Sequence, residues 1–403
     1  MVSEKGWQQP QDGKYCLPAA HEDGKSFLFQ VNIRINSLSL EYFLSQNDGQ
    51  IAAIGQKIID GQRLSADEGL TLYNSRDLGL LGALACFVKR QKSGNEVYYN
   101  KNFHIEPTNI CIYRCRFCSY SCHAEDSNSW EKSKEDIIKI AKRYQQSDIT
   151  EVHIVGGVHP DRDAFFYADM LQVIRAVLPD VHIKAFSAVE LDYMFDKAKL
   201  TDNEGFELLK QAGLQSIPGG GAEIFDEEIR RQLCPEKTGS QRWLNIHRSA
   251  HRAGIQSNAT MLYGHIEKYS HRIDHLNRLR DLQDETGGFN AFIPLKYRAG
   301  NNLMSLNNEL TSIEDMKNYA VSRIFLDNIP HIKAYWPMIG KDMAQMALAF
   351  GADDMDGTID DTTKIYSMVN QKPTMTTAEM IEMISAAGYK AVERDSYYSV
   401  MNN

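Results

Sequence analysis

The stretch "FHIEPTNICIYRCRFCSYSC", residues 103–122, decides how the rest of the chain is interpreted. It starts as a strand-like apolar run and continues into four cysteines within twelve residues, from Cys111 to Cys122. Cysteines this close together either bind metal or form disulfides. A site closed by four thiolates would carry electrons or hold structure. A site with three thiolates would leave one coordination position open to a bound molecule.

The composition is that of an ordinary globular protein. The 403 residues are 43% hydrophobic and 24% charged, and the net charge of -9 gives no general attraction to nucleic acid or anionic lipid. The longest apolar run, residues 78–88, is shorter than the ~20 residues of a membrane span, and the N-terminus lacks a secretory apolar region. The seven cysteines are odd in number and include the isolated Cys16, Cys86 and Cys234. This pattern predicts a reduced, cytoplasmic protein.

Four parts are predicted along the chain. Residues 1–35 read as an irregular extension and residues 36–100 as a helical segment that packs on the following domain. In that segment Ser65 and Glu68 have capping-box spacing, and further along the chain Ser133 and Asp136 form a second cap pair and Gly287 closes an amphipathic helix. Residues 101–365 form the main domain, and residues 366–403 a C-terminal helix and tail.

Short apolar stretches alternate with helical patterns throughout residues 101–365. Eight such stretches are strand-like: "FHIEPTNI", "EVHIVGGV", "VHIKAFSAV", "LQSIPGGG", "QSNATMLYG", "FNAFIPLKY", "HIKAYWPMI" and the weak "DDMDGT". Alternation of this kind predicts a parallel sheet, because parallel neighbours need crossover connections. The predicted fold is an α/β, TIM-type (βα)8 barrel, closed or incomplete, with helical additions at both ends. In such a barrel the cysteines, which follow the first strand, lie on the catalytic face.

The cysteine spacing favours an iron–sulfur cluster over zinc. Cys111, Cys115 and Cys118 form C-x3-C-x2-C, and three thiolates of one short loop can hold a [4Fe–4S] cluster with one iron open. Zinc motifs usually bring two separated cysteine pairs, and no second pair is present. Cys122 is interpreted as a free buried thiol, although a closed cluster with Cys122 as the fourth ligand is an alternative.

With Phe117 as the aromatic residue, C-x3-C-x-aromatic-C after the first strand resembles the signature of radical S-adenosylmethionine enzymes. The resemblance implies that S-adenosylmethionine occupies the open iron. One electron from the cluster then breaks the sulfonium bond and gives a 5′-deoxyadenosyl radical.

The same resemblance implies a cosubstrate pocket. Gly156 and Gly157 match a Gly-Gly-Glu element that meets the methionine amine, but Val158 replaces the acid, which leaves backbone contacts only. Glu190 or Ser187 is expected at the ribose hydroxyls. A tight turn and a solvated loop acid are the corresponding structural alternatives.

Further pocket residues are expected from the cysteine loop and the fourth strand. Tyr113 and Phe117 are placed beside adenine, unless they serve packing. Gly220 and Glu223 in "IPGGGAEIF" are expected to line the adenosyl pocket, unless the glycines only form a bend. The G-x-G-x-x-G spacing of a dinucleotide site is absent.

The blocks "SNATMLYGHIE" and "IPGGGAEIFDE", with the others, resemble the aminodeoxyfutalosine synthases of the menaquinone futalosine pathway. The implied substrate is 3-[(1-carboxyvinyl)oxy]benzoate. The adenosyl radical adds to its double bond, the aryl group migrates and a carboxylate is lost. The product is 6-amino-6-deoxyfutalosine, so S-adenosylmethionine is a consumed cosubstrate.

Two carboxylates on this substrate call for cationic or hydrogen-bonding anchors. The candidates are His265, Lys296, Arg298 and Lys333, each of which has a structural alternative as a solvated or packed side chain. Strand alternation puts Lys296 and Arg298 on one face and Tyr297 on the other.

Other functions share the cysteine loop. Dehypoxanthine futalosine cyclase and the partner enzyme of deazaflavin (FO) synthesis also use an adenosyl radical. From a different class, a non-catalytic iron–sulfur electron carrier would need Cys122 as a ligand. The low potential required suggests flavodoxin or ferredoxin as reductant.

Overall fold

The fold is taken from a computed structural model. It describes residues 40, 41, 44, 45, 49–300, 302–304, 306, 309–357 and 374–401. The predicted extension at residues 1–35 lies outside the described residues.

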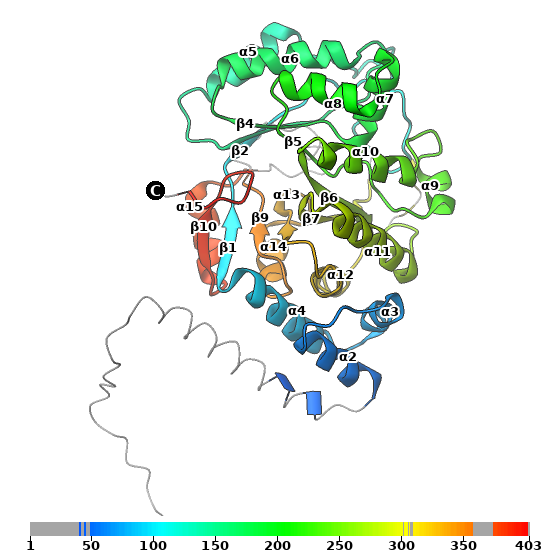
Figure 1. The fold of residues 1–403 in the computed structure, drawn as a ribbon, viewed down its shortest axis with the longest axis vertical. Helices are drawn as coiled ribbons and strands as arrows, with labels where there is room; N and C mark the ends of the chain where they lie inside the picture. Colours follow the sequence, from blue (N-terminus) through cyan, green and yellow to red (C-terminus); the bar gives the residue numbers. More distant parts are fainter. Residues whose placement is uncertain are drawn as a thin grey trace, which may run out of the picture.

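A curled sheet of ten parallel strands forms the centre of the molecule (Figure 1), in the order β10-β1-β9-β8-β7-β6-β5-β4-β3-β2. The strands are β1 (Glu96–Tyr99), β2 (Asn102–Ile105), β3 (Glu151–Ile154), β4 (His182–Ala185), β5 (Ser216–Ile217), β6 (Gln256–Tyr263), β7 (Phe289–Lys296), β8 (His331–Ala334), β9 (Asp354–Met355) and β10 (Lys390–Glu393). Strands β2 to β9 coincide with the eight predicted stretches, so the TIM-type barrel prediction is confirmed.

The barrel is incomplete along the seam between its first and last strands. Among the described residues, a single backbone hydrogen bond crosses this seam, from Asn102 N to Gly357 O at 3.3 Å. At the amino-terminal end of this seam, β1 leads into β2 and pairs with β9 on one edge and with β10 on the other. These two extra pairings extend the sheet beyond eight strands, and neither β1 nor β10 was predicted.

Helices surround the sheet on its outer face (Figure 1). They are α5 (Lys134–Arg143), α6 (Ala164–Val177), α7 (Ala188–Ala198), α8 (Asp202–Gln211), α9 (Glu227–Leu233), α10 (Ser240–Arg252), α11 (Tyr269–Thr286), α12 (Ser312–Phe325), α13 (Trp336–Ile339) and α14 (Lys341–Leu348). The N-terminal helices are α2 (Gln50–Ile59), α3 (Ala66–Asn74) and α4 (Leu78–Ser93), and α15 (Thr377–Ala386) precedes β10. One continuous apolar core joins the outer face of the sheet to these helices.

The local signals for helix ends are confirmed. Ser65 and Glu68 form the predicted capping box of α3, and Ser133 and Asp136 form that of α5. Each box satisfies backbone N–H groups that the first turn leaves unpaired. Gly287 ends α11 in the left-handed conformation, with φ of 63°, which glycine adopts without steric cost.

The short segment after β10 lies across the amino-terminal end of the barrel. Ser396 Oγ donates to Glu151, the first residue of β3, at 2.7 Å, and the Tyr397 ring contacts His182, the first residue of β4. Tyr398 stacks on His331 at the start of β8, with ring centroids 3.9 Å apart. Residues 394–398 therefore close the end of the barrel opposite the cysteine loop.

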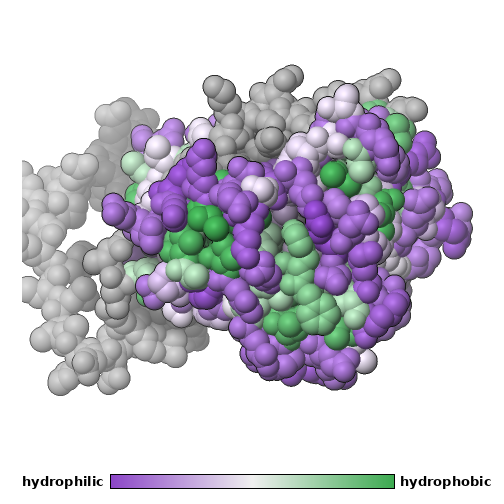
Figure 2. All heavy atoms as spheres, turned by 90° about the horizontal axis from the view of Figure 1, so that it is seen from above, coloured by the Kyte–Doolittle hydropathy of each residue, from purple (hydrophilic) through white to green (hydrophobic). Residues whose placement is uncertain are grey.

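The surface seen from the side of α5 to α8 is mostly hydrophilic, with limited apolar areas between polar side chains (Figure 2). Within the described part of the chain, no helix combines the length and the hydropathy of a membrane span.

Candidate active site

The cysteine loop starts directly after β2 and is fixed to three neighbouring segments through its backbone. Cys111 N donates to Cys122 O at 2.9 Å, and Ile112 N donates to Val158 O after β3 at 2.9 Å. Arg116 N donates to Leu233 O at the end of α9, at 2.8 Å. The loop therefore lies across the carboxyl ends of the strands, where barrel enzymes carry their catalytic groups.

The expected ligands Cys111, Cys115 and Cys118 fit a cluster better than a single ion. Among the described residues, no three His, Cys, Asp or Glu side chains converge on one metal ion. A [4Fe–4S] cluster spaces its thiolates more widely, because each binds a separate iron. Burial raises the pKa of Cys111, so this thiol is protonated until a metal replaces its proton.

An open cleft of about 610 Å³ lies beside this loop. Its lining consists of Arg114, Cys115, Cys118, Ser119, Ser121, Cys122, Asp126, Asn128, Asn302 and Leu303. The cleft leaves Cys118 partly exposed, whereas Cys115 is buried at its wall, so a cluster here would lie close to the surface.

Cys122 has a structural environment of its own. The residue is 6% exposed, and its thiol accepts a hydrogen bond from Asn109 Nδ2 at 3.3 Å. Its backbone forms a parallel bridge with Ile110. These contacts suit the interpretation of Cys122 as a buried thiol that holds the loop closed.

Cys234 lies beside the cysteine loop, although the sequence places it far from the other cysteines. The Cys234 thiol is hydrogen-bonded to Cys115, and this bond together with burial raises the pKa of Cys115. Lys237 is buried next to both thiols and pairs with Glu223, while its ammonium lies 5.6 Å from the Phe117 ring centroid. A positive charge here favours the thiolate form that iron binds. Local spacing contains no signal for this contact, which depends on how α9 packs.

The two glycines after β3 are required by close packing. A Cβ on Gly157 would lie 2.2 Å from Ile110 O, and one on Gly156 would lie 2.9 Å from Thr108 O. The glycine turn is thus pressed against the start of the cysteine loop. Gly156 and Gly157 therefore adjoin the expected cosubstrate position while serving the packing.

Glu190 and Ser187, the residues expected at the ribose, bind each other. Glu190 accepts from Ser187 N and Ser187 Oγ, both at 2.7 Å, and from Gly156 N at 3.1 Å. Burial raises the pKa of Glu190 to about 7. The carboxylate links the glycine turn to the first turn of α7. The preceding Phe186 has a φ of 65°, a strained conformation of the kind often found at functional sites.

The remaining pocket candidates, Tyr113, Phe117, Gly220 and Glu223, lie near the carboxyl end of β5. Gly220 O accepts from Trp243 Nε1 at 3.1 Å, and Glu223 has a φ of 50° with its side chain paired to Lys237. Tyr113 and Phe117 are half-buried and pack against the core. The structure thus gathers Tyr113, Phe117 and Glu223 near the cysteine loop.

The four anchor candidates differ in direction and partners. His265 is buried beside Glu267, Nδ1 to carboxylate 3.1 Å, and Lys296 pairs with Asp315 of α12 at 2.7 Å. Lys296 therefore points outward, toward the helices. Arg298 contacts Glu309 at 3.1 Å.

Lys333 is the one of the four that faces the barrel interior at the level of the strands. Its ammonium lies 3.2 Å from Asp356 and 3.5 Å from Asp354. Sequence inspection missed other interior side chains, His104, His153 and Lys184. The sequence does contain a signal for these side chains, because each is the third residue of its strand, in β2, β3 and β4.

Comparisons with known proteins agree with this geometry. The family model described as the radical SAM superfamily matches residues 105–279, and the CofH/MqnC C-terminal region matches residues 286–403. Aminodeoxyfutalosine synthase of Thermus thermophilus is 39% identical over 87% of this chain and 96% of its own length.

Two relatives with other names are slightly less similar. 5-Amino-6-(D-ribitylamino)uracil–L-tyrosine 4-hydroxyphenyl transferase of Methanoculleus marisnigri is 36% identical, over 85% of this chain and 96% of its own length. Cyclic dehypoxanthine futalosine synthase of Streptomyces coelicolor is 34% identical, over 85% and 88%.

The fold is also that of a solved structure. The FeFe-hydrogenase maturase HydG of Carboxydothermus hydrogenoformans superposes with a TM-score of 0.70 over 94% of this chain and 87% of its own, at 18% identity. The prediction from the cysteine motif and the strand pattern is confirmed: the chain belongs to the radical SAM superfamily, and within it to the aminodeoxyfutalosine synthase group of carbon–carbon bond-forming enzymes.

Proposed function

We propose that this enzyme makes 6-amino-6-deoxyfutalosine from S-adenosylmethionine and 3-[(1-carboxyvinyl)oxy]benzoate. C5′ of the adenosyl group bonds to the terminal vinyl carbon, the aryl group moves from oxygen to the other vinyl carbon, and the enolpyruvyl carboxylate leaves as carbon dioxide while the oxygen becomes a carbonyl. The electron released with the carbon dioxide equals the one spent on cleaving the sulfonium bond, so the steps are redox-neutral overall. Methionine is the other product. The observation that carries the proposal is the 39% identity with aminodeoxyfutalosine synthase over nearly the whole of both chains.

Cys111, Cys115 and Cys118 would hold the cluster, which supplies the electron that cleaves the sulfonium bond. The chain's own part is to position the cosubstrate and to exclude water. Backbone of the Gly156–Gly157 turn is near enough to the cysteine loop to meet the methionine amine. Tyr113 and Phe117 supply aromatic surface for adenine. The cleft lined by Cys115 and Cys118 is where flavodoxin or ferredoxin would dock and deliver electrons.

The barrel interior suits a dry radical reaction. Tyr263 and Lys296, which pair across β6 and β7, both bind Asp315 of the outer helix α12. Alternation then turns their neighbours Leu262 and Leu295 inward. This apolar wall would hold the aryl ring away from water, which limits side reactions of the radical.

The test is an anaerobic assay of the reconstituted enzyme with dithionite, S-adenosylmethionine and the proposed substrate, analysed by mass spectrometry. One product containing both the adenosine and the benzoate, with methionine released, would support the proposal. Free 5′-deoxyadenosine without that product would exclude this substrate, and dehypoxanthine futalosine or 5-amino-6-(D-ribitylamino)uracil with tyrosine would be tried next. A fully reduced cluster that cleaves no S-adenosylmethionine would favour an electron carrier.

A further inference from the structure

A row of polar side chains crosses the barrel interior at one level. His104 of β2 is in register with His153 of β3, which is in register with Lys184 of β4. The two imidazole rings meet edge to face, with centroids 5.0 Å apart. Phe103, the neighbour of His104, stacks on Tyr144 after α5. Since Phe103 faces the outer helices, alternation directs His104 and its row inward.

Electrostatic contacts confirm the inward direction of the row. Asp356 follows β9, at the opposite side of the barrel seam, yet its negative charge acts on both His104 and His153. Burial lowers the pKa of His104 and brings that of His153 to about 3. Both imidazoles are therefore neutral at physiological pH and can donate one N–H each.

His153 has an unused hydrogen-bonding atom. Its Nε2 is buried and has no hydrogen-bond partner among the described residues. The residue as a whole is partly exposed, so other atoms of the ring border a hollow in the interior, and a small rotation of the ring would bring the covered Nε2 to it. A buried polar atom left unpaired is costly, and native proteins usually supply a partner. A ligand in the hollow would supply it.

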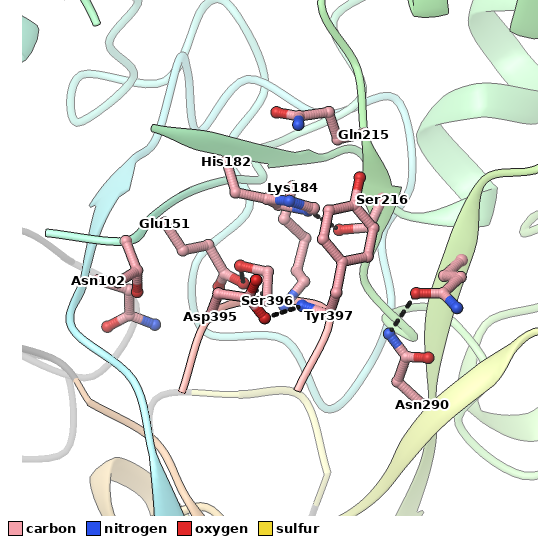
Figure 3. Close-up of polar contacts among 12 residues, drawn as sticks. Asn102, Glu151, His182, Lys184, Gln215, Ser216, Asn290, Asp395, Ser396 and Tyr397 are labelled. Carbon is pink, nitrogen blue, oxygen red and sulfur yellow. Dashed lines mark hydrogen bonds and ion pairs between the residues drawn. The ribbon is translucent and has the colours of Figure 1, made fainter. Parts of the chain in front are cut away.

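The charged side chains at the level of the row and below it are already paired with opposite charges. Lys184 binds Glu151 at 2.5 Å, and Glu151 also accepts from Ser396. Figure 3 shows these three side chains pointing toward one another beneath the barrel strands. Lys333 is likewise shared between Asp354 and Asp356. The floor thus offers an incoming carboxylate little free positive charge, which makes the neutral imidazole donor important.

The histidine row lies on β2 and β3, and Leu262 and Leu295 give the facing strands β6 and β7 an apolar inner surface at their carboxyl ends. Further down β6 the same alternation turns the polar Thr260 and Asn258 inward. An aromatic ring with a carboxylate on one edge matches this division. The substrate's vinyl group must be near the cysteine loop, so the ring carboxylate at the far end is directed deeper into the barrel.

We propose that His153 binds the ring carboxylate of the substrate through an Nε2–H donor, with His104 packed against it. This assignment rests on the proposed function and adds the residue that selects a carboxylated aryl group. The hydrogen bond positions the ring so that the vinyl carbon remains beside C5′.

The experiment compares two substrates that differ only in the ring carboxylate. They are 3-[(1-carboxyvinyl)oxy]benzoate and 2-phenoxyacrylate, each given to the wild-type holoenzyme and to His153→Ala and His153→Gln. We expect His153→Ala to raise KM and the dissociation constant for the benzoate ~10- to 100-fold, as loss of a hydrogen bond to a charged group does. Both constants for 2-phenoxyacrylate should change less than about twofold. His153→Gln, which keeps an N–H donor, should recover part of the benzoate affinity.

Control measurements separate the assignment from folding and from the proposed function. His182→Gln alters another interior histidine, bound to Ser216 at the lower end of the barrel, and should leave the ratio of the two KM values unchanged. Cleavage of S-adenosylmethionine without substrate should persist in all variants. Equal losses with both substrates, or no loss with the benzoate, would overturn the role of His153. A wild-type enzyme that fails to bind the benzoate would instead overturn the proposed function.

Discussion

Arg394, at the closed end of the barrel, provides the sharpest test of how the fold is held together. Its guanidinium is 1% exposed and binds Asp354 through Nε at 2.8 Å and Nη2 at 2.7 Å. Nη1 donates to Asp395 O at 2.9 Å, and the group lies 3.9 Å above the Tyr398 ring. Arg394→Met keeps an unbranched side chain as far as the ε position and removes all these contacts.

The expected cost follows from what remains around Asp354. Breaking a buried ion pair by removing one partner costs about 3–5 kcal/mol, because a charge is left uncompensated. Asp354 would keep Lys333 at 3.5 Å and the Tyr398 hydroxyl at 2.8 Å. We therefore expect the lower part of that range, about 3 kcal/mol.

Lys390→Met on β10 is the matched control. Its ion pair with Glu96 has similar geometry, 2.9 Å, but the lysine side chain is 70% exposed. Exposed pairs contribute about 0–1 kcal/mol. Urea unfolding of the cluster-free protein, followed by fluorescence and circular dichroism together, measures both variants. Adding Asp354→Asn to Arg394→Met should restore part of the lost stability. A loss for Arg394→Met no larger than that for Lys390→Met would refute the reasoning.

Three further predictions concern the site. Gly157→Ala should lower the iron content of reconstituted protein severalfold, because the new Cβ would lie 2.2 Å from Ile110 O and displace the cysteine loop. Gly239→Ala is the control, because its φ is negative and the nearest atom to its new Cβ would be 3.7 Å away. Cys122→Ala should keep the iron and sulfide content of the wild type, whereas Cys118→Ala should lose most of it; the reverse result would make Cys122 a ligand. Burial raises the pKa of Glu190 to about 7 from 4.5, so the folded state holds this proton more tightly than the unfolded state. Its contribution to stability is present below pH 4.5 and falls as pH rises through about 7, by about 3 kcal/mol. Glu190→Gln should flatten this part of the pH dependence of the urea midpoint, and an unchanged slope would contradict the assignment.

Sequence patterns predicted those features of the fold that depend on local signals. The capping boxes at Ser65 and Ser133 and the terminal Gly287 each act within one helical turn, so their residues identify them. Apolar stretches of strand length likewise located all the strands from β2 to β9. The pairing of Glu96 with Lys390 has no local signature, which is why β1 and β10 were missed.

In the candidate site, too, features with a local sequence signal were predicted and contacts between distant segments were not. The spacing of Cys111, Cys115 and Cys118 predicted the cysteine loop directly. The direction of Lys296 was undecided, because strand alternation gives two faces and only packing against α12 settles which is outer. Cys234 reaches Cys115 through the position of α9, and His153 meets its neighbours through the register of separate strands. Both contacts join distant segments, so neither could be derived from spacing.

Substitutions at the closed end of the barrel and at His153 are expected to impair the reaction in different ways. Arg394 and Ser396 hold the closing segment in place and make no contact with the cysteine loop in the described structure. Loosening that segment with Arg394→Met would loosen the enclosure of the substrate, and the radical would then more often take a hydrogen atom from a nearby C–H or S–H bond, giving more free 5′-deoxyadenosine per product. Changing His153 would leave the closure intact and alter the preference between carboxylated and uncarboxylated rings. The ratio of 5′-deoxyadenosine to product, measured with both substrates, therefore separates enclosure from recognition; the same change in both variants would show that the interior cannot be divided in this way.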